Sequence, residues 1–540
     1  MKKFFGFLFI LSIFCFNQSL LAEGKAKEKA AFRDPDAIIA TQELSSLPKD
    51  IISVPMLKDL LSEDFVFYYR DSGADWLSFR GALARLAYEH KTDWPTRFLA
   101  WLMNGPAEIA LWKGPEGRLS QFLVVIDQTG VKSLVEELAK AMISNGGSDS
   151  QLSTIKIGDR EVYALKLATQ RSVYFTSIEN RLFLFSDQNL PLPDATRGRG
   201  IIDRAKSFFG ASAEIGVFGP KLNKLKHSIH ISAPFFSFGY QSFFSEIKAL
   251  RFTFDSKSWE SQILAAKELR QVDSKVWSSM PRGAALCVSV PIDKKKIANI
   301  VKLQEWVDKT DSVASACWYP DSKLYSPLIS VHGDYAKLLN NTNDLQKVFS
   351  YIIGSREAFW PKEVDSEAAP SQLAWAPKLA VSSTKVGTAF VLSREVGGRY
   401  GMQITTKSKN HAQLRSRRFF RVKLAANSNT ILFSPDDQLV DRGLSTLDGK
   451  MPSMMASLPA QAKGASVILA PESFAKLTKQ TMLESLPESQ ESIFRGAIAK
   501  HFFPNLDKFG KRPMQAASLS AASSANPHWI KLEWATNASH

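Results

Sequence analysis

The most informative scarcity in this chain of 540 residues is that of cysteine, which occurs only three times. Cys15 lies in an apolar N-terminal segment that we expect to be removed, so the mature chain keeps Cys287 and Cys317. The sequence contains no Cys-x-x-Cys pair, which argues against a thiol redox enzyme. In an oxidising compartment two lone cysteines can form a disulfide, whereas two separate buried thiols are the alternative. Cys287 and Cys317 are therefore a candidate disulfide.

Long apolar runs are also scarce. After residue 22 no stretch approaches the roughly 20 apolar residues that a membrane-spanning helix needs. Residues 1–22 combine Lys2 and Lys3 with an apolar core and a small residue, Ala22, at the end, which is typical of an export signal. We therefore expect a signal peptide over 1–22, a flexible charged leader over 23–35 and a periplasmic location. An uncleaved N-terminal anchor is the alternative.

Motifs of known catalytic sites are missing as well. There is no G-x-S-x-G elbow, no H-E-x-x-H helix, no P-loop and no dinucleotide fingerprint. Ser-x-x-Lys, the pattern of serine enzymes with a lysine base, occurs often enough for chance to explain it. Only the copy at Ser382 lies near an expected loop. The sequence predicts no enzyme activity and no cofactor; the Ser-x-x-Lys copies begin at Ser153, Ser245, Ser382 and Ser473.

The eight histidines show no spacing that would bind a metal. His227 and His230 stand three apart and could share a helical face, but no carboxylate lies at ligand spacing. We expect a solvated pair there rather than a zinc site. Asp436, Asp437 and Asp441 do not have the spacing of a calcium loop, so they predict a polar turn.

What the chain does contain is an internal repeat. Residues 171–188 read RSVYFTSIENRLFLFSDQ, and residues 421–438 read RVKLAANSNTILFSPDDQ. In each stretch an alternating apolar strand ends at an Asn and a second apolar strand follows, which is typical of a β-hairpin. Further landmarks occur in the same order in both halves, which indicates a tandem duplication. These landmarks are 46–48 with 279–281, 112–125 with 318–331, 160–167 with 399–406, a strand-proline-helix unit from Gly210 with one from Gly464, and 250–267 with 519–534.

The repeat predicts an α+β fold made of two domains, 36–272 and 273–540. Each domain is expected to be an antiparallel sheet that helices cover on one face. The second domain carries an insert at about 350–385, which we expect to be a packed loop. Tryptophans at matching places in the repeats predict buried core positions rather than a ligand site. They are Trp112, Trp259, Trp318 and Trp529.

The chain has a formal net charge of +15, and its one unusual charge feature is a basic run over residues 385–423. Arginine forks there could bind phosphate or carboxylate groups. The alternative, which we favour, is a strand with Phe420, Val422 and Leu424 pointing inward. In that strand Arg421 and Lys423 would point into water. The two interpretations are compatible, because the outer face of a strand can also be a docking face. The candidate face consists of Arg415, Arg417, Arg418, Arg421 and Lys423.

Two stretches carry a resemblance to a known family. Residues 36–69 read DAIIATQELSSLPKDIISVPMLKDLLSEDFVFYY, and residues 317–328 read CWYPDSKLYSPL. Both are similar to the YfaA-like family of exported bacterial proteins. The resemblance implies a periplasmic location and a supporting role for an alpha-2-macroglobulin-like protein encoded nearby. It implies no catalytic residue.

The sequence leaves three hypotheses for the function. The first is a non-enzymatic exported protein that binds a partner, with an alpha-2-macroglobulin-like envelope protein as the partner that the resemblance implies. The second is a binder of anionic envelope lipid or polymer through the basic face; nucleic acid is not expected as a partner. The third is an envelope hydrolase whose site forms only in three dimensions, with Ser382 or Ser473 as the serine to test.

Overall fold

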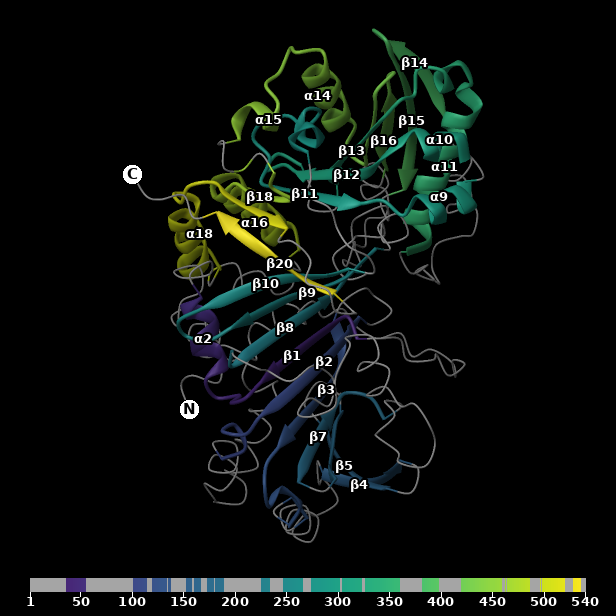
Figure 1. Cartoon of the computed structure of the whole chain (residues 1–540). Helices are drawn as coiled ribbons and strands as arrows, with labels where there is room; N and C mark the ends of the chain where they lie inside the picture. The colour runs from purple at the N-terminus through teal and green to yellow at the C-terminus, as the bar shows by residue number, and fades with distance from the viewer. Residues whose placement is uncertain are drawn as a thin grey trace. The chain divides into compact units, whose positions relative to one another are not determined.

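The chain divides into two compact units in the computed structural model (Figure 1). The first unit comprises Met1–Ser232, Arg251–Glu260 and Gln490–Phe502. The second unit comprises Ala233–Leu250, Ser261–Ser489 and Phe503–His540. The domain limits expected from the sequence stay a prediction. The residues that the structure describes are 35–54, 101–113, 119–136, 152–157, 160–166, 172–188, 225–233, 246–265, 273–301, 304–322, 326–359, 381–397, 419–458, 462–485, 496–519 and 528–535, without residues 134, 179, 463 and 497.

The first unit is built on an antiparallel sheet with the strand order β8-β1-β2-β3-β7-β6-β5-β4. Strand β1 is buried at each of its residues, whereas β4, at the other end of this order, is largely outside the core. Trp112, Phe185 and Ile38 are among the large side chains that this core buries completely. The strands are β1 (Ala37–Thr41), β2 (Ala107–Lys113), β3 (Leu119–Asp127), β4 (Leu152–Ile157), β5 (Arg160–Lys166), β6 (Ser172–Ile178), β7 (Arg181–Phe185) and β8 (His227–Ser232).

Helix α2 (Leu47–Ser53) follows β1 in the first unit. Pro48 occupies its first turn, where a missing N–H is harmless. Leu47 and Ile51 lie one turn apart and are both buried, so one face of the helix packs into the protein. A turn at Asp255–Ser258 separates β9 (Ile247–Phe254) from β10 (Trp259–Ala265).

The second unit contains a longer antiparallel sheet with the order β14-β15-β16-β17-β13-β12-β11-β18-β19-β20-β10. Residues 261–265 of β10 form the last strand beside β20. The other strands are β11 (Leu286–Pro291), β12 (Thr310–Trp318), β13 (Leu328–Gly333), β14 (Ser382–Val386), β15 (Ala389–Gly397), β16 (Phe419–Ala426), β17 (Thr430–Ser434), β18 (Val467–Leu469), β19 (Gln515–Leu519) and β20 (His528–Ala535).

Helices of the second unit pack on two apolar clusters. Leu439 and Val440 of α14 join the cluster that surrounds Trp277 and Tyr319, and Phe349 of α11 joins the cluster around Tyr335. The helical segments are η2 (Ser274–Trp277), α9 (Lys294–Val301), α10 (Gln304–Lys309), η3 (Leu338–Asn340), α11 (Thr342–Phe359), α14 (Asp437–Leu447), α15 (Met454–Ser457), α16 (Pro471–Ser485) and α18 (Phe503–Gly510); the π-helix η7 (Ile498–Phe502) belongs to the first unit. The chain is therefore mainly antiparallel sheet with helices, in agreement with the α+β expectation.

The two sheets pair their strands in the same sequence. The order β8-β1-β2-β3-β7-β6-β5-β4 corresponds strand by strand to β18-β11-β12-β13-β17-β16-β15-β14. The registers agree as well: Leu111 lies opposite Ala37, and Cys317 lies opposite Cys287. In the next pairing, Leu123 faces Phe185 while Ile329 faces Phe433.

One landmark pair of the sequence repeat does not correspond in the structure. Residues 46–48 follow β1, whereas residues 279–281 precede β11. Another predicted landmark, the strand-proline-helix unit from Gly210, lies outside the described residues over 210–224. The strand after Gly464, β18, lies beside β11 as β8 lies beside β1.

Parts of the predicted insert and of the tryptophan set also differ from expectation. Residues 350–359 continue helix α11, and residues 382–385 belong to strand β14, so neither is a loop; residues 360–380 lie outside the described part.

Of the four tryptophans predicted to be core positions, Trp112 is buried, as predicted. Trp259, Trp318 and Trp529 are only half-buried, because each stands at or near the end of its strand.

Candidate functional site

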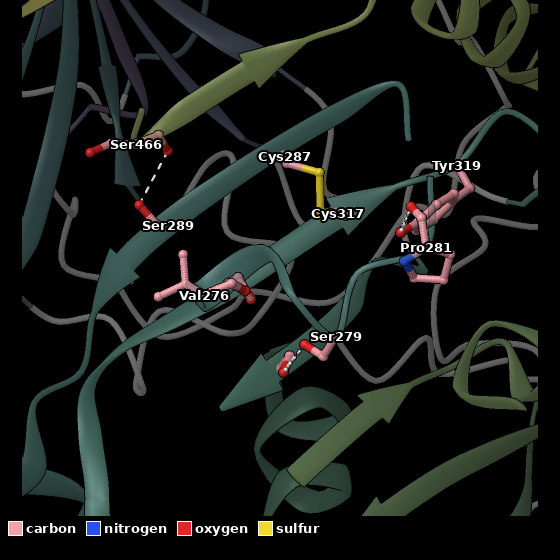
Figure 2. The surroundings of a disulfide bond; sticks show 10 residues. Val276, Ser279, Pro281, Cys287, Ser289, Cys317, Tyr319 and Ser466 are labelled. Carbon is pink, nitrogen blue, oxygen red and sulfur yellow. Dashed lines mark hydrogen bonds between the residues drawn. A yellow bond between two sulfur atoms is a disulfide. The ribbon is translucent and has the colours of Figure 1, made fainter. Parts of the chain in front are cut away.

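Cys287 and Cys317 meet in the core of the second unit. Cys287 of β11 and Cys317 of β12 are cross-strand neighbours joined by a disulfide, with an S–S distance of 2.02 Å (Figure 2). Both residues are fully buried. Nearby, the Tyr319 hydroxyl donates to the carbonyl of Pro281 at 2.9 Å (Figure 2). Because both sulfur atoms are buried, this disulfide cross-links two core strands and is not accessible to a redox partner.

A cleft of about 690 Å³ lies beside this core in the second unit. Ala284 and Met454 line it and also belong to the apolar cluster that holds the disulfide, so the base of the cleft is core. Helices α16 and α18 pack together (Figure 1). Their residues supply much of the wall of the cleft. The lining residues are Arg282–Ala284 before β11, Met454 and Ser457 of α15, Ala470–Ser473, Ala475, Lys476 and Lys479 around α16, and Asp507, Gly510–Arg512 and Met514 around α18.

The charges around the cleft do not balance. Its carboxylates each have a lysine partner: Glu472 binds Lys476 at 2.7 Å, and Asp507 binds Lys479. The pKa of Glu472 is lowered by its hydrogen bond to Lys476. Arg282 and Lys511 also line the cleft, and they add positive charge that no ion pair among the described residues neutralises.

Arg282 and Lys511 are available to a ligand, because both side chains are exposed. The guanidinium of Arg512 lies 5.3 Å from the ring centre of Phe509, which fixes its position at the end of α18. Part of this charge also serves the helix, because cations near a helix C-terminus stabilise it. That role accounts for Lys511 and Arg512 but not for Arg282, which comes from the loop before β11.

The N-terminus of α16 opens into the same cleft. Ala470 precedes the helix and offers no side-chain oxygen to cap it, and its carbonyl accepts from the N–H of Phe474 at 2.9 Å. The N–H groups of Glu472 and Ser473 therefore have no acceptor within the helix. Both residues line the cleft. Backbone N–H groups and the positive end of a helix favour a bound anion at such a place.

The cleft contains one of the Ser-x-x-Lys patterns, but the groups do not form a nucleophile. Ser473 and Lys476 both line the cleft and share a helical face. The Lys476 ammonium is largely exposed and binds Glu472, and none of the hydrogen bonds among the described residues joins it to Ser473. A serine nucleophile needs a base within hydrogen-bond reach. Ser473 and Lys476 therefore lack the contact that a serine–lysine nucleophile pair needs.

The other Ser-x-x-Lys patterns are no better placed. Ser153 and Ser382 lie in strands β4 and β14, where a residue and the third one after it point to opposite faces. The hydroxyl of Ser382 lies 2.6 Å from that of Ser393. Ser245 lies outside the described residues.

The basic face expected from the sequence is only partly described. Val422 and Leu424 of β16 are fully buried and Arg421 is exposed, as expected for a strand. The placement of Lys423 in water is wrong: its ammonium binds both carboxylate oxygens of Asp441 in α14, at 2.8 and 2.7 Å. The side chain is drawn inward because the helix supplies a carboxylate above the strand. Arg415, Arg417 and Arg418 lie outside the described residues.

The expectation of a solvated histidine pair is wrong. His227 and His230 both lie in strand β8, not on a helix, and both are buried. His227 Nε2 is 2.8 Å from Asp50 Oδ2, and its Nδ1 is 2.8 Å from the hydroxyl of Thr41. Burial lowers the pKa of His227 against the opposing effect of Asp50. The three groups resemble a catalytic triad in chemistry, but all are buried, so they fasten α2 to the sheet.

A second buried polar network was not visible in the sequence. The Ser279 hydroxyl donates to that of Ser330 at 2.6 Å (Figure 2), and His332 Nε2 is 3.5 Å from the Ser279 hydroxyl. The other ring nitrogen of His332 lies 3.3 Å from the hydroxyl of Thr430. Burial lowers the pKa of His332. Because both serines are fully buried, no substrate reaches them.

Metal ligands do not gather anywhere in the described stretches. Within them, no three His, Cys, Asp or Glu side chains come together as a metal would need. Helices long and apolar enough to cross a membrane are likewise not found in that part of the chain.

Comparison with known proteins places the chain in a family. It belongs to the family described as uncharacterized protein conserved in bacteria (DUF2138), which matches residues 17–534. The uncharacterized protein YfaA of Escherichia coli (strain K12) is 31% identical over 521 residues, which cover 93% of this chain and 90% of that protein. The resemblance noted in the sequence is thereby confirmed. No solved structure matches the chain.

Proposed function

We propose that this protein is a non-enzymatic binding protein that holds an anionic group in the cleft beside α16. The observation that carries the proposal is the excess of cations around that cleft, where Arg282 and Lys511 have no ion-pair partner among the described residues. The N–H groups at the start of α16 add donors of the right polarity. Phosphate and carboxylate are the groups that such donors recognise.

This proposal moves the binding of anions away from the face expected from the sequence. Lys423 of that face is already neutralised by Asp441, whereas the cleft keeps its charge. Exposed pairs of opposite charge contribute little in water, but a cleft with a low-dielectric base concentrates the field of its cations. Binding should therefore weaken as the salt concentration rises.

Calorimetric titration of the full chain with tripolyphosphate tests the proposal. We expect binding at low ionic strength that falls with added salt and is lost in the double variant R282Q/K511Q. Lys385→Gln is the matched control, because Lys385 is an exposed cation of the basic run and lies far from the cleft in the strand order. Equal loss in the control variant, or no binding by the wild type, would refute the assignment of this cleft.

We also propose that the chain arose by tandem duplication of one α+β unit. Identical strand order and matching registers in the two sheets support this. Independent origins would rarely give the same order of eight strands, because sheet topologies are many. An experimental structure with a different strand order in either sheet would refute the duplication.

The partner implied by the resemblance remains a separate proposal. We propose export to the periplasm from the apolar segment at 1–22, and an alpha-2-macroglobulin-like partner because the resemblance noted in the sequence implies one. Affinity capture of the mature protein from an envelope fraction tests both, with retention at high salt expected for a specific protein interface. Recovery of no such protein would count against the partner.

A further inference from the structure

We infer that the anion held by the cleft is the head group of an anionic lipid in a bilayer, so that this face of the second unit docks on a membrane surface. The inference rests on the proposed function, since it assigns the source of the anion to the same cleft. A bilayer presents anionic head groups above an apolar layer, and a docking protein needs cations and exposed apolar side chains on one face.

Helix α16 carries both kinds of side chain along one stripe. Glu472, Lys476 and Lys479 line the cleft, and Leu483 follows them at the next helical position of the same face. Leu483 is 39% exposed. On the other side of the helix Leu477 is buried in the protein. The stripe therefore passes from charged to apolar while it stays at the surface.

Exposed large apolar side chains are few in the described part of the chain. They are Val386, Met455 and Leu483. Met455 belongs to α15 and Leu483 to α16, and both of these helices frame the cleft. A single exposed leucine is ordinary in a soluble protein. Here, two of the three exposed apolar side chains lie on helices that frame the same cationic cleft. This placement fits a membrane-facing surface better than a chance distribution.

The charge arrangement also favours a surface over a small soluble anion. The cations without a carboxylate partner among the described residues come from two separate segments, with Arg282 in the loop before β11 and Lys511 after α18. A flat array of head groups can reach both together, and each cation near an anionic surface increases partitioning by about fivefold. An acidic protein would meet the same cations but would have to supply a pocket for Leu483.

Vesicle sedimentation with the full chain tests the inference. Vesicles of phosphatidylcholine are compared with vesicles that also contain phosphatidylglycerol, at low and high salt. We expect binding only to the anionic vesicles, and a loss of roughly 25-fold in R282Q/K511Q because two cations are removed. Circular dichroism checks that each variant is folded.

Two further variants separate the membrane from the soluble anion. Leu483→Ser should weaken vesicle binding several-fold while its titration with tripolyphosphate stays unchanged. Val386→Ser is the matched control, since Val386 is 54% exposed on strand β14 and should leave both measurements unchanged.

The outcomes distinguish this inference from the proposed function. Tripolyphosphate binding without vesicle binding overturns the membrane inference and leaves the cleft as a site for soluble anions. Vesicle binding that is equal in wild type and Leu483→Ser also overturns it. The absence of both kinds of binding overturns the inference and the proposed function together.

Discussion

Acid should loosen the first unit because His230 must stay neutral in the folded protein. His230 lies in β8 at 1% exposure, and burial, with a contribution from Arg251, lowers its pKa to about 3. In the unfolded chain a histidine has a pKa of about 6.5. Between these two values the unfolded state binds the proton and the folded state does not. Stability is therefore complete above about pH 6.5 and decreases as the pH falls toward the folded pKa.

The size of this loss of stability follows from the difference between the pH and the pKa of the unfolded histidine. At about pH 4.5 the solution is roughly two units below the pKa of the unfolded histidine, and each unit corresponds to about 1.4 kcal/mol. His230 alone should then reduce the free energy of unfolding by about 2.7 kcal/mol. His227 acts in the same direction, because its pKa is also lowered by burial.

Hydrogen exchange, followed by mass spectrometry, measures the free energy of opening of this sheet. The peptides to follow come from β1 and β8, and their rates are corrected for intrinsic exchange. The informative variant is His230→Val, because valine occupies the matching position of the second sheet. There Val467 lies opposite Val288, as His230 lies opposite Ile38 in the first sheet. The variant should lose about 2.7 kcal/mol less than wild type between about pH 7.5 and 4.5.

The second unit provides the control for this experiment. Peptides of β13 carry His332, whose pKa is lowered by burial in the second unit, and their pH dependence should not change in His230→Val. The loss of the hydrogen bond between Ser228 and His230 affects all pH values alike and does not alter the slope. An identical acid slope of the β1 and β8 peptides in wild type and variant would refute the reasoning.

Three further predictions concern the buried groups. Changing Cys287 and Cys317 to alanine opens a loop with a sequence separation of 30 and should cost about 3–4 kcal/mol, seen as a lower urea midpoint of the second unit. Trp112→Ala removes a side chain that is 1% exposed and should cost about 3–5 kcal/mol in the first unit; an unchanged midpoint would contradict its place in the core. Asp50→Ala leaves His227 without its carboxylate and should cost about 1–3 kcal/mol at neutral pH, measured by exchange of β8 amides.

Local features of this fold could be predicted from the sequence. The hairpins at 171–188 and 421–438 became β6 with β7 and β16 with β17, because alternation and an Asn turn are encoded by neighbouring residues. The disulfide partners could be named because the mature chain has only two cysteines, and the structure brings them together. Their pairing needs no knowledge of distant contacts.

The cleft could not be predicted in the same way. Arg282, Lys476 and Lys511 come from segments far apart in the chain, and only the packing of α16, α18 and the loop before β11 unites them. The basic run at 385–423 was the stronger signal in the sequence, yet an aspartate from another element neutralises Lys423. His227 and His230 were misjudged because a spacing of three was assigned to a helix, whereas they lie in a buried strand.

The composition of the first unit affects how the protein folds during synthesis. This unit includes Gln490–Phe502, and Ile498 and Phe502 within that segment are buried. Domains generally fold as they leave the ribosome, N-terminal first, but this one cannot be completed until residue 502 has emerged. A nascent chain ending at residue 272 would expose the surface that this segment covers. The first unit is therefore completed late in synthesis, although most of it lies in the N-terminal half of the chain.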